Sequence, residues 1–185
     1  MLQPEATYLT KTVTVAKYRE LEAAGDRVAS GRFIVERFYE RYFEPTVGAP
    51  KRHGFTLVAV GCLVIETLEC FYEGKATSQG CSRAIFRNFF TRPTGLEALG
   101  RGGDWFYRDI RCGILHQAET CKGWRIRRSG PLLDATSHSI NAKRFIVLLQ
   151  KAVEAYAINL AKDPALWENF RTKMDAICNN CIRED

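Results

Sequence analysis

Long hydrophobic runs and histidine are both scarce in this chain of 185 residues. The longest apolar run, FTLVAVGCLVI at 55–65, falls short of the ~18 residues that a membrane span requires. Residues 1–12 lack the basic start and apolar centre of a secretory signal. We therefore expect a cytoplasmic protein without a membrane partner.

Internal repeats and low-complexity tracts are also missing. Hydrophobic residues make up 46% of the chain and charged residues 26%, as in ordinary globular proteins, and this length can bury a sizeable core. We expect one domain over residues 1–185. Its N-terminal helices would occupy 1–50, its core about 55–162, and its last helix 164–181.

A second closely spaced cysteine pair is missing as well. Seven cysteines are present, and CNNC at 178–181 has a spacing seen in metal and redox pairs. A closed zinc site needs four ligands, and an odd number of thiols within apolar patterns is typical of reduced core cysteines. We favour a structural or incidental role for Cys178 and Cys181 over a metal or redox role, and we expect no metal site and no cofactor.

Positive charge is in excess. The formal net charge is +6, and the chain has 18 arginines and 9 lysines. Guanidinium groups form paired hydrogen bonds with phosphate and with carboxylate. The excess therefore suits a nucleic acid or another polyanion, and it equally suits a solvated surface or salt bridges between helices.

Helical periodicity dominates the rest of the chain. We expect helices over 10–24, 31–43, 55–73, 83–90, 104–119, 139–162 and 165–180, with 44–54 as a loop. Ser30, Asp104 and Ser139 are candidate N-caps, and Gly61 would permit close helix packing. The alternating segment GWRIRR at 123–128 predicts a short strand or hairpin. The expected fold is an all-α bundle with this small β insertion.

The segment RDIRCGILHQAET at 108–120 concentrates polar groups near the end of an amphipathic helix. Arg111 and His116 form an Arg-x4-His pair. Residues five apart lie ~140° apart around a regular helix. Their side chains therefore converge only if Gly113 distorts the helix or if a second chain supplies its own copies. Asp109 and Cys112 share the side of His116, so Asp109 could orient the imidazole.

The longer segment FYRDIRCGILHQAET resembles the signature region of the HEPN superfamily, whose ribonucleases carry Arg-x(4–6)-His late in a four- or five-helix bundle. The order of helices over 55–162 also fits. The resemblance implies a HEPN-like bundle with extra terminal helices that works as a homodimer. It further implies a metal-independent endoribonuclease, a toxin or phage-defence effector with an antitoxin or regulatory partner.

In that family the ribose 2′-hydroxyl attacks the adjacent phosphate, a reaction open only to RNA. The resemblance gives His116 the role of general base or acid, because imidazole exchanges protons near neutral pH. It gives Arg111 the role of stabilising charge in the transition state. Many HEPN ribonucleases have Asn, Asp or His directly after the arginine, where this chain has Cys112. A non-catalytic HEPN-like module for dimerisation, or for binding nucleotides or proteins, is the alternative.

Further residues complete the hypothesis. Glu66 lies in the most apolar helix and needs a cationic partner, Arg111 or Arg108. Asp109, Cys112 and Gln117 are the other supporting candidates. RNA contacts are expected from Arg108, Lys122, Trp124, Arg125, Arg127 and Arg128, since a basic arm with an aromatic can hold the backbone and stack a base. The opposing interpretations are a solvated hairpin edge, a structural Arg111 paired with Glu66 or Glu69, and a core or interface His116.

Overall fold

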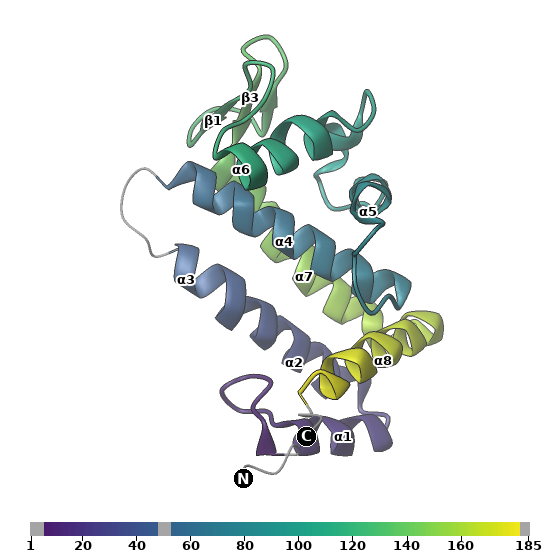
Figure 1. The fold of residues 1–185 in the computed structure, drawn as a ribbon. Coiled ribbons are helices and arrows are strands. Elements are labelled where there is room, and N and C mark those ends of the chain that lie inside the picture. The colour runs from purple at the N-terminus through teal and green to yellow at the C-terminus, as the bar shows by residue number, and fades with distance from the viewer. Residues whose placement is uncertain (1–5, 48–52, 182–185) are drawn as a thin grey trace.

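The computed structural model describes residues 6–47 and 53–181, which form a helical bundle with a small β-sheet at one end (Figure 1). Two segments have π-type turns, η2 and η4, and one is a 3-10 helix, η3. In chain order the elements are α1 (Val15–Ala23), α2 (Arg27–Phe38), η2 (Tyr39–Phe43), α3 (Glu44–Val47), α4 (Gly54–Glu73), α5 (Ser82–Phe89), η3 (Glu97–Gly100), η4 (Phe106–Arg111), α6 (Cys112–Gln117), β1 (Arg125–Arg127), β2 (Leu133–Asp134), β3 (Ser139–Asn141), α7 (Ala142–Leu160) and α8 (Pro164–Asn179).

Helices α4 and α7 form the centre of the bundle, with α2 packed on α7 and α8 on α4 (Figure 1). Helices α4 and α7 approach closely because Gly61 of α4 has no side chain. A Cβ at this position would lie 2.3 Å from Cε1 of the buried Phe145. The prediction that Gly61 permits close packing is therefore confirmed.

None of the three predicted N-caps is confirmed. Ser30 and Ser139 do not directly precede a helix, and the Asp104 side chain forms no capping hydrogen bond among the described residues. The chain turns into α2 at Asp26, whose carboxylate accepts from the Ala29 amide at 2.9 Å, so Ser30 lies inside the helix. Asn141 caps α7, because Ser139 belongs to β3. The Asp104 side chain turns instead toward Arg87, at 3.4 Å.

The N-terminal helices differ from the prediction at two places. The first helix begins later than predicted, at Val15, and helical structure continues past residue 43. Residues 10–13 lie outside α1, which Thr14 caps through the Lys17 amide. Beyond α2 the chain continues through η2 into α3, so the predicted loop at 44–54 is wrong over 44–47. The part of that loop at 48–52 lies outside the described residues.

The β insertion is larger than predicted. The strand predicted within 123–128 is confirmed as β1, which pairs in parallel with β3 through Ile126 and Ile140. Strand β2 pairs antiparallel with the other edge of β3. Residues 139–141 were predicted as the first turn of a helix, but they form the central strand.

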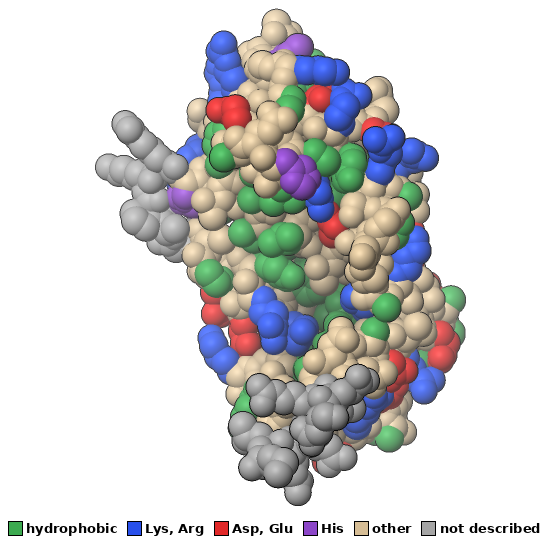
Figure 2. Space-filling model, viewed as in Figure 1, with side chains coloured by type: hydrophobic (Ala, Val, Ile, Leu, Met, Phe, Trp, Pro, Cys, Tyr) green, Lys and Arg blue, Asp and Glu red, His purple; other side chains and the backbone are tan. Residues whose placement is uncertain are grey.

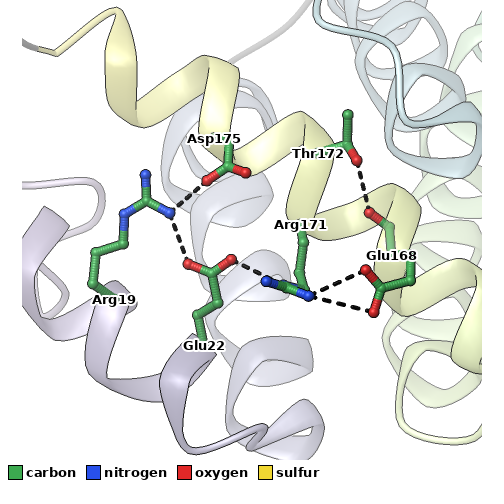
Figure 3. A network of polar contacts seen from close by, with 6 residues as sticks. All are labelled: Arg19, Glu22, Glu168, Arg171, Thr172 and Asp175. Carbon is green, nitrogen blue, oxygen red and sulfur yellow. Dashed lines mark hydrogen bonds and ion pairs between the residues drawn. The ribbon is translucent and has the colours of Figure 1, made fainter.

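Helix α8 is attached to α1 by a network of ion pairs (Figure 3). Glu22 accepts from Arg19 at 2.7 Å and from Arg171 at 3.0 Å. Arg19 also reaches Asp175 on α8. The shared carboxylate joins two helices that lie far apart in the sequence, which places the C-terminal helix on the bundle.

Among the described residues, α4 is long and apolar enough to cross a membrane. In this fold it is the central helix, and it carries Glu66 and Glu69 as buried members of ion pairs. Its apolar character is accounted for by its place in the core.

All seven cysteines are free thiols, and Cys62, Cys70 and Cys178 are buried. Burial raises the pKa of Cys178 to about 11, so this thiol is a poor nucleophile near neutral pH. The Cys181 thiol donates to the Ile177 carbonyl at 3.3 Å. No group of three or more His, Cys, Asp or Glu side chains suited to a metal occurs within 6–47 and 53–181.

Candidate functional site

Arg111 and Glu66 form the polar centre of the site. Nε and Nη2 of Arg111 lie 2.8 Å and 2.7 Å from the same oxygen, Oε1 of Glu66. The other oxygen, Oε2, accepts from the hydroxyls of Ser78 at 2.6 Å and Ser82 at 3.1 Å. The buried carboxylate of α4 is therefore fully paired, and it fixes the position of the guanidinium.

The Arg111 side chain is 16% exposed, so part of it reaches the surface. Its guanidinium lies 5.6 Å from the centre of the Tyr107 ring, within the range of a cation–π contact. Burial lowers the pKa of Arg111, but attraction to Glu66 and hydrogen bonding outweigh burial and raise it overall. The guanidinium stays charged, with one edge compensated by Glu66.

The helix that carries these residues is widened before Arg111. The Cys112 amide bonds to the Tyr107 carbonyl, five residues earlier, as in a π-type turn. From Cys112 to Gln117 the helix is regular, so Gly113 does not distort it. Regular geometry leaves Arg111 and His116 on different sides, ~140° apart. The expectation that Gly113 distorts the helix and lets the two side chains converge is therefore wrong.

Gly113 serves a different purpose. A Cβ there would lie 2.5 Å from the Glu119 carbonyl oxygen. After α6 the chain reverses at Ala118, which has a φ of 56°, and the Cys121 amide donates to the Asp109 carbonyl at 2.7 Å. The glycine lets the following loop fold back over the helix.

His116 lies on the exposed side of α6, near its end. Within residues 6–47 and 53–181, its ring has no hydrogen bond or ion pair with another side chain. Gln117 beside it is also exposed. The imidazole is therefore accessible to a substrate or to a second chain.

The expectation that Asp109 orients His116 is wrong. Asp109 is buried and accepts from Nε and Nη2 of Arg108, each at 2.7 Å. This pairing with Arg108 lowers the pKa of Asp109 below its usual range. The carboxylate is engaged by its chain neighbour, with Lys122 at 3.9 Å, and belongs to the fold of the loop.

Cys112 directly follows Arg111 in the chain. It is half-buried, and its thiol interacts with the Tyr107 hydroxyl. Burial and this hydrogen bond together raise the pKa of Tyr107. Tyr107 is thus a neighbour of both Arg111 and Cys112. Its role was not predicted, because an aromatic at that helical position is typical of a core residue.

The candidate RNA-binding residues of the arm differ in exposure. Arg125 and Arg127 lie on β1 with exposed side chains, whereas Ile126 between them packs inward near Gly54. Arg128 is half-buried, and its Nε has no hydrogen-bond partner among the described residues. Lys122 is exposed and Trp124 is half-buried at the start of the arm. Arg125 and Arg127, at the sheet edge, are available to a ligand.

An apolar surface lies beside the site. Phe55 and Leu63 of α4 and Leu115 of α6 are 37%, 44% and 42% exposed. Helices α4 and α6 contact each other, and Figure 2 shows hydrophobic side chains gathered over the middle of α4. We call Phe55, Leu63 and Leu115 the α4–α6 face. Leu115 directly precedes His116 in the chain, and exposed apolar side chains of this kind are suited to covering by another chain.

Compared with protein-family models, with curated proteins and with solved structures, the chain matches none of them.

Proposed function

We propose that this protein is a HEPN-type, metal-independent endoribonuclease that works as a homodimer in the cytoplasm. The observation that carries the proposal is the pairing of two contrasting groups five residues apart. Arg111 is held in place by a buried carboxylate, and His116 is exposed without a polar partner among the described residues. One group is positioned, and the other is accessible to a substrate.

The reaction assigns a task to each group. His116 removes the proton from a ribose 2′-hydroxyl, whose oxygen attacks the adjacent phosphorus. The bond from phosphorus to the 5′-oxygen breaks, leaving a 2′,3′-cyclic phosphate and a 5′-hydroxyl after that oxygen takes up a proton. Arg111 donates hydrogen bonds to the phosphate oxygens as charge develops. Glu66 acts as a positioning residue, because it holds Arg111.

The α4–α6 face supports the dimer. A two-fold interface pairs the same surface patch on both copies, and a contact through this face would place His116, the chain neighbour of Leu115, near the interface. Because Arg111 and His116 diverge within one chain, a shared cleft would take its arginine and its histidine from different copies. An antitoxin or regulatory protein would bind the same face and exclude the second copy, as expected for a toxin or a phage-defence effector.

A second function, a non-catalytic binding module of the same fold, is favoured by one observation. Glu66 accepts both hydrogen bonds on one edge of Arg111. A guanidinium compensated in this way has fewer donors for a phosphate, and the Cys112 thiol beside it is only a weak hydrogen-bonding group. This interpretation predicts dimers that bind a ligand without cutting RNA.

The test is cleavage of a labelled single-stranded RNA in the presence of a chelator. We expect the wild type to cut, His116→Ala to be inactive, and Arg111→Lys to be at least about 100-fold slower. Arg92→Lys is the matched control, because Arg92 makes a similar pair with Glu69 on α4, at 2.6 Å and 2.7 Å. Undiminished cleavage by His116→Ala, or equal losses for the two arginine variants, would reject the assignment.

A further inference from the structure

Three aromatic rings stack face to face beside β1. The rings of Trp105 and Trp124 lie 4.1 Å apart between centroids, with their planes 13° apart. His138 continues the stack, 5.0 Å from Trp124 and inclined by 17°. These residues come from the start of the motif-bearing helix, from the arm and from the turn before β3. We call them the ring stack.

Each residue of the stack is fixed by a hydrogen bond, Trp105 through its ring and Trp124 and His138 through the main chain. Nε1 of Trp105 donates to the Arg101 carbonyl at 2.9 Å, and the Trp124 carbonyl accepts from the Thr120 hydroxyl. The Arg125 amide donates to the His138 carbonyl at 2.8 Å. A rigid stack loses little conformational entropy when a further ring is added.

Anchoring of the sheet accounts for the two tryptophans, which are half-buried, but it does not account for His138. That side chain is exposed, and its backbone has a φ of 46°, which is costly for a residue other than glycine. Asp134 holds the preceding turn by accepting from the amides of Thr136 and Ser137, each at 3.0 Å. The fold thus maintains a strained residue whose ring has only one ring neighbour among the described residues, Trp124.

Two arginines lie on the strand that follows Trp124. Arg125 follows Trp124 directly, and both Arg125 and Arg127 are exposed on β1, at the edge of the sheet. Figure 2 shows histidine and lysine or arginine side chains at the end of the molecule that carries β1 and β3. Flat rings beside backbone-binding cations are the combination that single-stranded nucleic acids recognise. The helix from Trp105 to His116 spans roughly 16 Å, so one strand can reach both.

We propose that the ring stack is a platform for an unpaired base of single-stranded RNA, which stacks on the outer face of His138 while Arg125 and Arg127 bind the flanking phosphates. The inference rests on the proposed function for its choice of RNA, and it deepens that function by naming the residues that hold an unpaired base of the substrate. A duplex does not fit, because its bases already stack on one another.

The test uses His116→Ala protein, which does not cut RNA under the proposal, and a fluorescein-labelled single-stranded RNA whose anisotropy reports binding. We expect His138→Asn to weaken binding at least about fivefold. Asparagine tolerates a positive φ, so this change removes the ring and keeps the turn. Binding should quench tryptophan fluorescence. Tyr8→Ala, which removes an exposed ring far from the stack, is the matched control and should bind normally.

Two further arms separate stacking from simple charge attraction. The same strand made with abasic sites keeps its phosphates and should bind the parent and His138→Asn equally weakly. Arg125→Gln should reduce the slope of log affinity against log salt by about 0.7, whereas Arg32→Gln, an exposed arginine on α2, should leave it unchanged. Equal binding by parent and His138→Asn, tight binding of the abasic strand, or equal affinity for duplex RNA would overturn the platform.

These results are independent of catalysis. His116-dependent cleavage with no effect of His138→Asn on binding would overturn the platform and leave the proposed function intact. Binding that depends on His138, in a protein that cuts no RNA, would support the platform and reject the nuclease.

Discussion

Glu66 and Glu69 lie about one turn apart on α4, and each holds an arginine from a later part of the chain. Glu66 is 8% exposed and pairs with Arg111, whereas Glu69 is fully buried and pairs with Arg92. In both pairs Nε and Nη2 of the arginine contact the carboxylate, but Arg92 contacts both oxygens of Glu69, whereas Arg111 contacts one oxygen of Glu66. Only the first includes a residue of the proposed site, Arg111, so the comparison separates a structural role from a positioning role.

We predict that Glu66→Gln and Glu69→Gln each lower the free energy of unfolding by about 3 kcal/mol, because each leaves an arginine without its carboxylate. Only Glu66→Gln should also lower RNA cleavage, since it releases Arg111. Urea unfolding and the cleavage assay measure the two effects separately. Equal activity in the two variants would show that Glu66 does not act through Arg111.

Asp109 gives the fold a dependence on acid. Its pKa is lowered in the folded protein, chiefly by hydrogen bonds from Arg108. As the pH falls, the unfolded chain therefore takes up a proton at this residue before the folded protein does. The stabilisation is complete above the ordinary Asp pKa of about 3.9. It is lost as the pH falls through the lower pKa of the folded protein. We predict that Asp109→Asn costs about 1 kcal/mol at pH 7 and flattens the loss of stability below about pH 4. Urea titrations at several pH values would show it; parallel pH curves for both proteins would contradict it.

At the scale of the elements, the central helix pair depends on one small residue. Gly61 places α4 against α7, where an added methyl group would meet the ring of Phe145 and Leu149. We predict that Gly61→Ala lowers the free energy of unfolding by about 1–3 kcal/mol despite the better helix propensity of alanine. Thr56→Ala, an exposed change on the same helix, should be neutral or slightly stabilising in the same urea titration. A stabilised Gly61→Ala would mean that the helices separate without cost.

The sequence predicts elements whose apolar pattern runs over several turns. It does not predict helix ends and short strands, which depend on a few residues. The central helix, the strand at 125–127 and the break at Asp163–Pro164 follow from periodicity and from proline. The caps at Asp26 and Asn141 could not be chosen over nearby serines, because several side chains of similar capping strength occur in each segment. The short strands β2 and β3 are too short to show an alternation.

The site was predictable in part for the same reason. A carboxylate in the most apolar helix requires a cation, and Glu66 does pair with Arg111. The contacts of Ser78, Ser82 and Tyr107 depend on how α5 and η4 pack, which no local pattern encodes. The ring stack joins residues 105, 124 and 138, so no short motif could reveal it.

At the scale of the whole molecule, the account requires a second copy. Arg111 ends η4 and His116 lies near the end of α6, five residues further on, where regular geometry turns the two side chains apart. Leu115 of the exposed α4–α6 face directly precedes the histidine in the chain. Covering that face would remove apolar side chains from water and bring the two sites together.

We predict that Leu63→Glu shifts the protein from dimer toward monomer and lowers RNA cleavage in parallel, while the fold remains intact by circular dichroism. Val147→Glu changes a similarly exposed residue on α7, 46% exposed, and should alter neither property. Light scattering after gel filtration gives the mass. A wild type that cuts RNA as a monomer would contradict the shared cleft.

The most direct measurement is of the ends of RNA fragments produced in chelator by the wild type and by His116→Ala. The account predicts 2′,3′-cyclic phosphate and 5′-hydroxyl ends from the wild type and no fragments from His116→Ala. It also predicts no cleavage at a nucleotide whose sugar lacks the 2′-hydroxyl. Intact RNA with the wild type, identical fragments from both proteins, or fragments with 5′-phosphate ends would contradict it.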